Sequence, residues 1–240
     1  MLTDCEIKNL PFKARGLEKM TGYIGDLQSI ISAFSHRPVK ILEIGFGFGQ
    51  VMAELFSLYR GEVELYGINS IEDPINTDKV IEIAMHQGRL PNDIIFHKDF
   101  LHITYGDAGA QLPYPNAFFD LIISQVCIPY VSDKLHLISE VCRVLKPEGK
   151  AKLHVGFEHS RLCDGSVGKW ITLSVNRYER EIDLETFFNS YPKFLYYKRT
   201  SGSVLEIDGG STVNFDFSLS RVVNKGEMDK GTYGICSVYN

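Results

Sequence analysis

Residues 39–51 read "VKILEIGFGFGQV" and contain the pattern that decides the fold. A run of branched apolar residues, typical of a buried strand, leads into Glu43. Glycines then stand at every second position, as Gly45, Gly47 and Gly49. Glycine loses more backbone freedom on folding than any other residue, so such a cluster needs a compensating reason. A tight turn from a strand into a helix, close to a bound ligand, is one such reason.

The composition of the 240-residue chain is that of an ordinary globular protein, with 44% hydrophobic and 23% charged residues. Its length suits one sizeable α/β domain. The formal net charge of −5 disfavours a nucleic-acid-binding protein, because phosphate binding needs a basic stripe. No apolar run is long enough to span a membrane, and the first residues lack the apolar core of a secretory signal. We therefore expect neither nucleic acid nor membrane as a partner.

The five cysteines are scattered along the chain, without a CxxC pair or a His/Cys spacing that suits a metal. An odd number without a pairing pattern indicates reduced thiols and a cytoplasmic protein. We expect no metal site, and no motif in the sequence sets an oligomeric state.

Strand-like and helix-like segments alternate through the first two thirds of the chain. Short apolar runs predict strands at 39–44, 63–68, 93–97, 118–124 and 150–157. Between them apolar residues recur at helical spacing, with Thr77 and Ser132 as capping residues, and an earlier helix is expected to end near Ser35. This βαβ rhythm predicts a parallel sheet with right-handed crossovers and helices on both faces.

The last third of the chain has a different pattern. A short helix is expected after Asp183, and strand-like runs follow it. These runs occupy residues 193–198, 203–207, 211–220 and 232–239. In the run 211–220 apolar and polar residues alternate, and Gly209 and Gly210 before it suit a hairpin turn. The carboxyl end is therefore expected to add antiparallel strands to the edge of the parallel sheet.

The spacing of the glycines narrows the choice of ligand. A phosphate loop would need GxxxxGK[ST], and a dinucleotide loop would need a glycine at the position of Gln50. The chain instead has GxGxG, two residues after an acid. This loop, with "LPYPNAFFDLIIS" at 112–124 and "RVLKPEGK" at 143–150, resembles the class I S-adenosylmethionine-dependent methyltransferases. The similarity is to the branch of the ubiquinone and menaquinone methyltransferases, and it covers roughly residues 38–157.

The resemblance implies which residues contact the cofactor, S-adenosylmethionine. The acid Glu43 would lie near the ammonium of its methionine portion. Asn69 stands where the family has a carboxylate for the ribose hydroxyls, and its uncharged amide would form weaker hydrogen bonds. Asp99 would take the place of the acid that contacts adenine after the third strand, and Gln125 would line the methyl end. The expected cofactor-binding residues are Glu43, Gly45, Phe46, Gly47, Gly49, Asn69, Ser70, Asp99, Phe100 and Gln125.

The acceptor side departs from the family pattern. Many members of the branch carry a His-His pair after the fourth strand, where this chain has Pro129 and Tyr130. His159, after the fifth strand, is the candidate general base. Tyr130 is a candidate to orient the acceptor or to face the sulfonium as a cation–π partner.

The resemblance implies an α/β, Rossmann-like three-layer sandwich with a mainly parallel seven-stranded sheet and antiparallel C-terminal strands. We expect a single domain over residues 1–240. Its parts are a helical cap (1–36), a cofactor-binding core (37–157), and a substrate-side insertion with the antiparallel edge (158–240).

The implied activity is transfer of a methyl group from S-adenosylmethionine, by in-line displacement, to an acceptor that is more readily a small molecule than a nucleic acid. Two alternatives remain open at this point. One is an enzyme of another class, such as a cyclase or a rearrangement enzyme, that uses the sulfonium only as a fixed positive charge. The other is a non-catalytic protein that binds the cofactor.

Overall fold

The structure is a computed structural model, and it describes most of the first two thirds of the chain and parts of the last third. The described residues are 16–70, 76–90, 99–128, 131, 134–156, 170–175, 178–183, 188–199, 202–210 and 221–222. For residues 134–135, 156, 170–175, 178–183 and 221–222 only the backbone is described.

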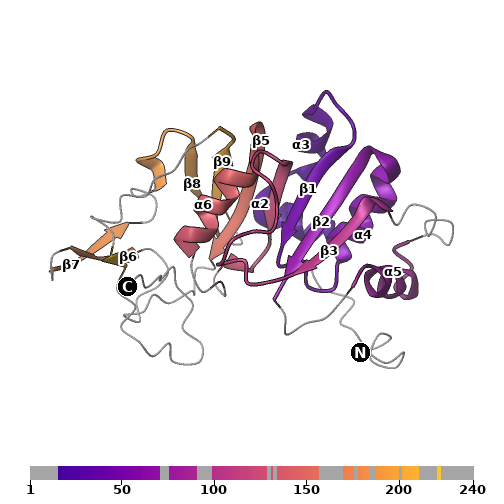
Figure 1. The fold of residues 1–240 in the computed structure, drawn as a ribbon, viewed down its shortest axis with the longest axis horizontal. Coiled ribbons are helices and arrows are strands. Elements are labelled where there is room, and N and C mark those ends of the chain that lie inside the picture. The colour runs from indigo at the N-terminus through magenta and orange to yellow at the C-terminus, as the bar shows by residue number, and fades with distance from the viewer. Residues whose placement is uncertain are drawn as a thin grey trace.

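A seven-stranded sheet forms the centre of the molecule (Figure 1). Its strands are β1 (Val39–Ile44), β2 (Val63–Asn69), β3 (Leu101–Tyr105), β4 (Phe119–Ser124), β5 (Leu145–Gly156), β8 (Phe194–Arg199) and β9 (Gly202–Asp208). They lie side by side in the order β3-β2-β1-β4-β5-β9-β8. The first five are parallel to one another, whereas β9 is antiparallel to both β5 and β8. The predicted mainly parallel sheet with an antiparallel C-terminal edge is confirmed.

Helices cover both faces of this sheet. They are α2 (Leu17–Ile24), α3 (Leu27–Ala33), α4 (Gln50–Tyr59), the 3-10 helix η1 (Arg60–Glu62), α5 (Thr77–His86) and α6 (Lys134–Val144). Side chains alternate along the central strand β1: Leu42 and Ile44 pack in the cluster that contains Ile138 of α6. Ile41 packs in the cluster that contains Leu55 of α4. The result is the predicted three-layer sandwich, in which α6 covers one face and α2 to α5 cover the other.

The helix predicted to end near Ser35 is two helices in the structure. Gly25, with a φ of 99°, ends α2. Asp26 then caps α3, and its carboxylate accepts hydrogen bonds from the backbone N–H groups of Gln28 and Ser29. A glycine followed by a capping acid is a stop signal and a start signal in succession, which explains why the helical spacing continues across a break.

The third parallel strand is β3, which was not predicted, and the segment 93–97 lies outside the described residues. β3 pairs with β2 from Leu101, opposite Leu65, to Tyr105, opposite Asn69. In β3 the apolar residues Leu101, Ile103 and Tyr105 alternate with His102 and Thr104, which is the period of a strand. The end of the third strand therefore lies further along the chain than the sequence analysis placed it.

A second sheet of three strands was also not predicted. It consists of β6 (Trp170–Val175), β7 (Tyr178–Asp183) and β10 (Arg221–Val222), paired antiparallel in the order β10-β6-β7. Figure 1 shows β6 and β7 beyond the β8 edge of the main sheet. The strands predicted at 211–220 and 232–239 lie outside the described residues. Of the helices that are described, none is long and apolar enough to cross a bilayer.

Candidate cofactor-binding site

The glycine loop lies at the carboxyl edge of the parallel strands, between the ends of β2 and β4. The N–H of Gly45 donates to the carbonyl oxygen of Ile68 at 2.8 Å, which joins the loop to β2. The Ser124 hydroxyl donates to the carbonyl oxygen of Ile44 at 2.9 Å, which joins β4 to β1. Because β1 has β2 on one side and β4 on the other, this is the point where the strand order reverses. Ligands of open α/β sheets bind at such a point.

All three glycines of the loop adopt the left-handed backbone conformation that favours glycine, with φ values of 74° at Gly45, 58° at Gly47 and 76° at Gly49. Their surroundings differ. A Cβ atom at Gly45 would overlap the side chain of Cys127, and one at Gly49 would overlap Val80 of α5. A Cβ at Gly47 would meet none of the described residues within 4 Å. The two outer glycines are therefore packed against the protein, and the middle one is bare and exposed.

Asn69, the last residue of β2, is hydrogen-bonded to the loop. Its Oδ1 accepts from the Gly47 N–H at 3.3 Å, and its Nδ2 donates to the Gly47 carbonyl oxygen at 3.0 Å. Its backbone carbonyl accepts from the N–H of Gly106 at 2.9 Å. Asn69 is buried, and the following residue, Ser70, is exposed. The structure therefore brings Asn69 to the loop and places Ser70 directly after it, but the Asn69 side chain is hydrogen-bonded to the protein itself.

Glu43 is a buried acid in the middle of the sheet. It lies opposite Gly67 of β2 and Ile123 of β4, and only 4% of it is exposed. Within the described part of the chain its Oε2 has no hydrogen-bond partner. Burial raises the pKa of this carboxyl to about 8, because the charged form loses its hydration. A buried, unpartnered carboxyl beside a bare loop fits the ammonium of S-adenosylmethionine, which would supply the missing partner.

Phe46 and Gln125 occupy different surroundings near the loop. The Phe46 ring packs in the core against Gly67, where an added Cβ would lie 2.6 Å from the ring. Gln125 follows β4 directly, is 3% exposed, and has no partner for its Nε2 among the described residues. The next residue, Val126, has a φ of 58°, which is strained for a β-branched side chain. Strain of this kind is concentrated at functional sites, and here it shapes the loop that carries Gln125.

Asp99 and Phe100 do not come to the glycine loop. They immediately precede β3, at the amino end of the strand, and Phe100 lies near Gly61 at the start of β2. The expectation that they follow the third strand is wrong, because the strand itself begins at Leu101. The acid that does follow it is Asp107, whose Oδ1 accepts from the Gly109 N–H at 2.8 Å. Apolar and polar residues alternate over 101–105, and Gly106 and Asp107 follow. This pattern in the sequence would have identified Asp107 as the acid after the third strand.

The two candidate catalytic residues, Tyr130 and His159, lie outside the described residues, so their roles stay predictions. Within the described ranges, no three His, Cys, Asp or Glu side chains gather in a way that could hold a metal ion.

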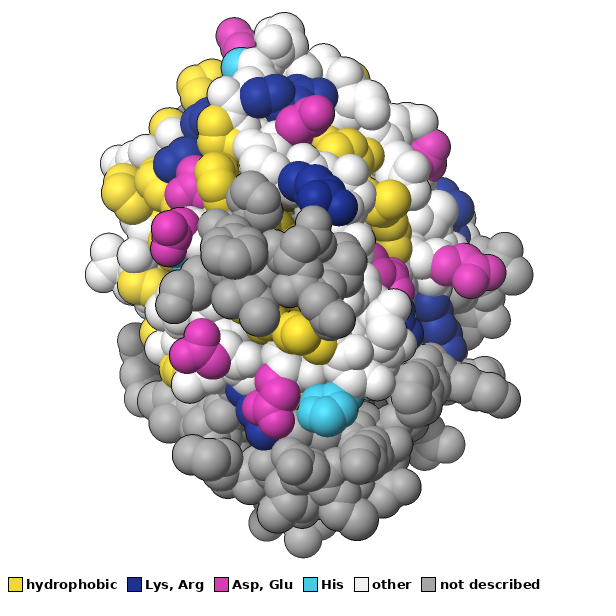
Figure 2. Space-filling model, turned by 90° about the vertical axis from the view of Figure 1, so that its right-hand side faces the viewer, with side chains coloured by type: hydrophobic (Ala, Val, Ile, Leu, Met, Phe, Trp, Pro, Cys, Tyr) yellow, Lys and Arg dark blue, Asp and Glu magenta, His cyan; other side chains and the backbone are white. Residues whose placement is uncertain are grey.

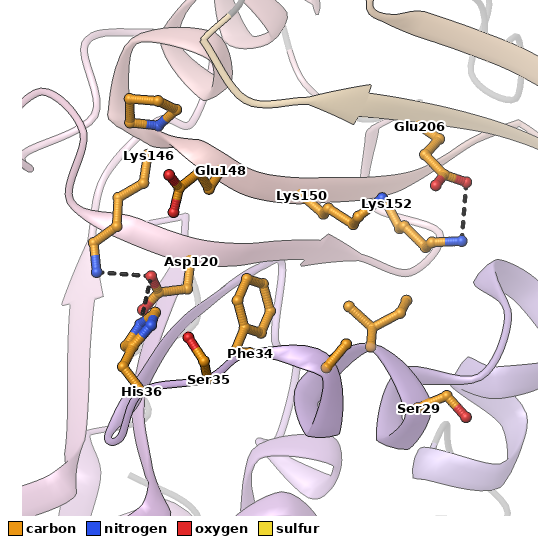
Figure 3. Close-up of a pocket in the computed structure, with 13 residues that line it drawn as sticks. Ser29, Phe34, Ser35, His36, Asp120, Lys146, Glu148, Lys150, Lys152 and Glu206 are labelled. Carbon is orange, nitrogen blue, oxygen red and sulfur yellow. Dashed lines mark hydrogen bonds and ion pairs between the residues drawn. The ribbon is translucent and has the colours of Figure 1, made fainter.

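A cavity of about 650 Å³ lies away from this loop, beneath α3 (Figure 3). Its charged side chains neutralise one another. The buried Asp120 carboxylate lies 2.7 Å from Lys146 Nζ and 3.0 Å from His36 Nε2, and Lys152 Nζ lies 2.9 Å from Glu206. Asp120 stands near the amino end of β4, whereas Gln125 follows its carboxyl end. None of the predicted cofactor residues lines this cavity.

Comparison with known proteins agrees with the resemblance found in the sequence. Residues 42–153 match the family model of the methyltransferase domain. The ubiquinone/menaquinone biosynthesis C-methyltransferase UbiE of Vibrio parahaemolyticus is 30% identical over 114 residues, which are 46% of this chain and 39% of that protein. Its namesake from Francisella tularensis is 28% identical over 126 residues, 51% of this chain and 45% of that protein. The chain therefore spans less than half the length of these curated relatives.

A solved structure shares the fold across more of the chain. It is a chain of the complex that contains the Trm112 methyltransferase activator of Haloferax volcanii. Its TM-score is 0.50 at 13% identity, and the match covers 86% of this chain and 95% of that one. At this identity the likeness concerns the fold alone. It confirms the Rossmann-like fold. The predicted cofactor, S-adenosylmethionine, is supported by the match to the methyltransferase family model and to the curated relatives.

The loop generates a prediction about two of its glycines. Gly49→Ala adds a methyl group that overlaps Val80 at a positive φ, so the free energy of unfolding should fall by about 3 kcal/mol or more. Gly47→Ala adds a methyl group that contacts no described residue. Its free energy of unfolding should therefore fall only by the backbone strain, about 1–2 kcal/mol. Yet Gly47→Ala should weaken binding of S-adenosylhomocysteine about tenfold or more, because its methyl group enters the crevice. Denaturant unfolding and calorimetry measure both effects, and unchanged binding in Gly47→Ala would contradict the assignment of the crevice.

The buried carboxyl generates a prediction about pH. The pKa of Glu43 is raised from 4.5 to about 8 in the folded protein, so between these values the folded state holds a proton that the unfolded state has lost. Stability contributed by this group therefore decreases as the pH rises through that window, by up to about 1.4 kcal/mol per pH unit, and levels off above it. Glu43→Gln has no such proton. Unfolding of both proteins between pH 5 and about 8.5 should show a steeper decline in the wild type, and parallel curves would refute the raised pKa.

Proposed function

We propose that this chain, whose residues 42–153 form a class I S-adenosylmethionine-dependent methyltransferase domain, transfers a methyl group to a small-molecule acceptor. One observation carries the proposal: the bare backbone of Gly47 and the buried Glu43 carboxyl lie together where the strand order reverses. The Oε2 atom of that carboxyl has no partner in the part of the chain that is described. The cofactor supplies a methyl group activated by a sulfonium, and in-line displacement of that group leaves S-adenosylhomocysteine.

Glu43 is assigned to the ammonium of the methionine portion. An opposite charge within a few ångströms favours the ionised carboxylate, so the bound ammonium reverses the effect of burial on the pKa of Glu43. Because the ligand-free carboxyl has a pKa of about 8, binding at neutral pH releases a proton from it. Without the ammonium, Glu43 is thus an uncharged acid in the core at neutral pH, and its charge forms when the ammonium binds.

The remaining cofactor contacts are assigned along the same edge of the sheet. The exposed Gly47 backbone provides a surface without side chains for the cofactor. Asp107, the acid that follows β3, takes the adenine contact that the sequence analysis gave to Asp99. The free Nε2 of Gln125 is directed to the methyl end, next to the turn at Val126.

Three observations support a small molecule as the acceptor. The chain is acidic, with a formal net charge of −5. On the face in Figure 2, the described Lys and Arg side chains are interspersed with Asp and Glu and do not form the continuous stripe that phosphate binding needs. The curated relatives are named for ubiquinone and menaquinone biosynthesis, which is small-molecule chemistry. Neither Cys127 nor Cys142 forms a disulfide within the described part of the chain, which agrees with the reducing, cytoplasmic setting that we propose.

The contribution of the protein to the rate is mainly positional. Holding an acceptor and the methyl group in line, away from water, can be worth roughly 7–11 kcal/mol of the barrier. A general base is required only where the acceptor atom arrives protonated with a high pKa. His159, in the substrate-side part of the chain from residue 158 onward, is our candidate for that base. Tyr130, which follows the fourth parallel strand, is our candidate for orienting the acceptor.

Methyl-labelled S-adenosylmethionine tests the proposal. The protein is incubated with the labelled cofactor and with the low-mass and macromolecular fractions of a cell extract, and S-adenosylhomocysteine and label are quantified. We expect product to form only with the low-mass fraction, and Gly47→Ala to reduce it. Label in protein or nucleic acid would contradict the acceptor class, and cofactor that is bound but never consumed would contradict methyl transfer.

A further inference from the structure

We propose that Asn69 is a positioning residue that locks the glycine loop, and that it has this role in place of binding the ribose of the cofactor. This inference rests on the proposed function, because it concerns the same site. In the family that the sequence resembles, a carboxylate at this position holds the ribose hydroxyls. The Asn69 amide is the point at which this chain departs from that pattern.

The geometry of the contact is bidentate. One amide side chain engages both polar backbone groups of one residue: Asn69 accepts from the Gly47 N–H at 3.3 Å and donates to the Gly47 carbonyl oxygen at 3.0 Å. Only one orientation of the amide satisfies both groups, since the flipped amide would set donor against donor and acceptor against acceptor. Asn69 is 8% exposed, so water does not readily replace these bonds.

A carboxylate cannot make this contact. An ionised Asp accepts hydrogen bonds only, so at position 69 it could still accept from the Gly47 N–H. Its second oxygen would face the Gly47 carbonyl oxygen, at the position where Nδ2 now donates. Two acceptors at this separation repel each other, and a buried acceptor without a donor destabilises the structure. The uncharged residue is therefore suited to holding the loop, and the acid of the family is not.

The loop depends on Asn69 because packing does not hold its centre. Gly45 and Gly49 are fixed by contact with Cys127 and Val80, but a Cβ at Gly47 would contact no residue that the structure describes. The Asn69 backbone also accepts from the Gly106 N–H at 2.9 Å, so this residue joins the segments that follow β1 and β3. The same bonds that hold Gly47 leave its outer side open, which is what a ligand needs.

The test is the isosteric substitution Asn69→Asp, measured by calorimetry with S-adenosylhomocysteine. If Asn69 locks the loop, the variant should bind about tenfold more weakly near pH 8. Lowering the pH should narrow its difference from the wild type, because a protonated carboxyl regains a donor. If Asn69 instead binds ribose, the charged acceptor should bind the ligand more tightly. Equal or tighter binding near pH 8 would overturn the inference.

Asn76→Asp is the matched control. Asn76 caps α5, where its Oδ1 only accepts a hydrogen bond from the Lys79 N–H at 2.9 Å. A carboxylate performs that role equally well, so the same chemical change should leave binding unaltered. A similar loss in both variants would show that added negative charge, and not the broken contact, weakens binding, and would also overturn the inference.

Amide hydrogen exchange in the ligand-free protein separates this inference from the proposed function. Asn69→Asp should speed exchange at residues 45–49, and Asn76→Asp should not. Should Asn69→Asp fail to fold, Asn69→Ala removes both bonds without adding charge and should give the same local change. A ribose-binding role predicts no change without ligand. A wild type that binds no nucleoside would refute the proposed function, while the exchange data would still decide the role of Asn69.

Discussion

The candidate site depends on how the backbone at Gly47 is held. The loop is fixed at both ends by packing and in the middle by two hydrogen bonds from the Asn69 side chain. This arrangement allows the central glycine to remain exposed without becoming disordered. A side chain packed over Gly47 would hold the loop equally well but would fill the crevice. Hydrogen bonding from the neighbouring strand keeps the loop rigid and the ligand surface free, which is the preorganisation that binding requires.

Two buried acids, near opposite ends of the central strands, differ in the partners that the protein provides for them. Asp120, near the amino end of β4, has the backbone N–H of Lys40, Lys146 Nζ and His36 Nε2 around it. Glu43, near the carboxyl end of β1, has an oxygen without a partner in the described structure and a pKa raised to about 8. The interior can therefore supply partners to a buried acid, and at Glu43 it does not. This contrast is the reason why we propose the carboxyl edge, and not the cavity beneath α3, as the ligand site.

The sequence was most informative where local chemistry and the global fold agree. The strand before Glu43, the spacing of the glycines and the apolar run at 118–124 predicted the centre of the sheet, because buried parallel strands read as continuous apolar runs. Prediction was less successful where two neighbouring segments both had the pattern of the third parallel strand. The apolar residues at 93–97 drew the prediction away from the alternating strand 101–105. Asp99 was therefore expected to follow the third strand, whereas the acid that follows β3 is Asp107. The contact between Asn69 and Gly47 could not be predicted, because a side-chain hydrogen bond across a turn produces no repeating pattern in the sequence.

A nitrogen–proton NMR titration with S-adenosylhomocysteine tests the central claim most directly. The account predicts that the backbone amides of Gly45, Gly47 and Gly49 and the side-chain amide of Asn69 shift together and saturate. Signals from Lys146 and Lys150, which line the cavity beneath α3, should stay unchanged. Shifts confined to that cavity would contradict the account. Unchanged loop signals at ligand concentrations of about 1 mM would also contradict the account, because even a binding free energy of about −4 kcal/mol is detectable there.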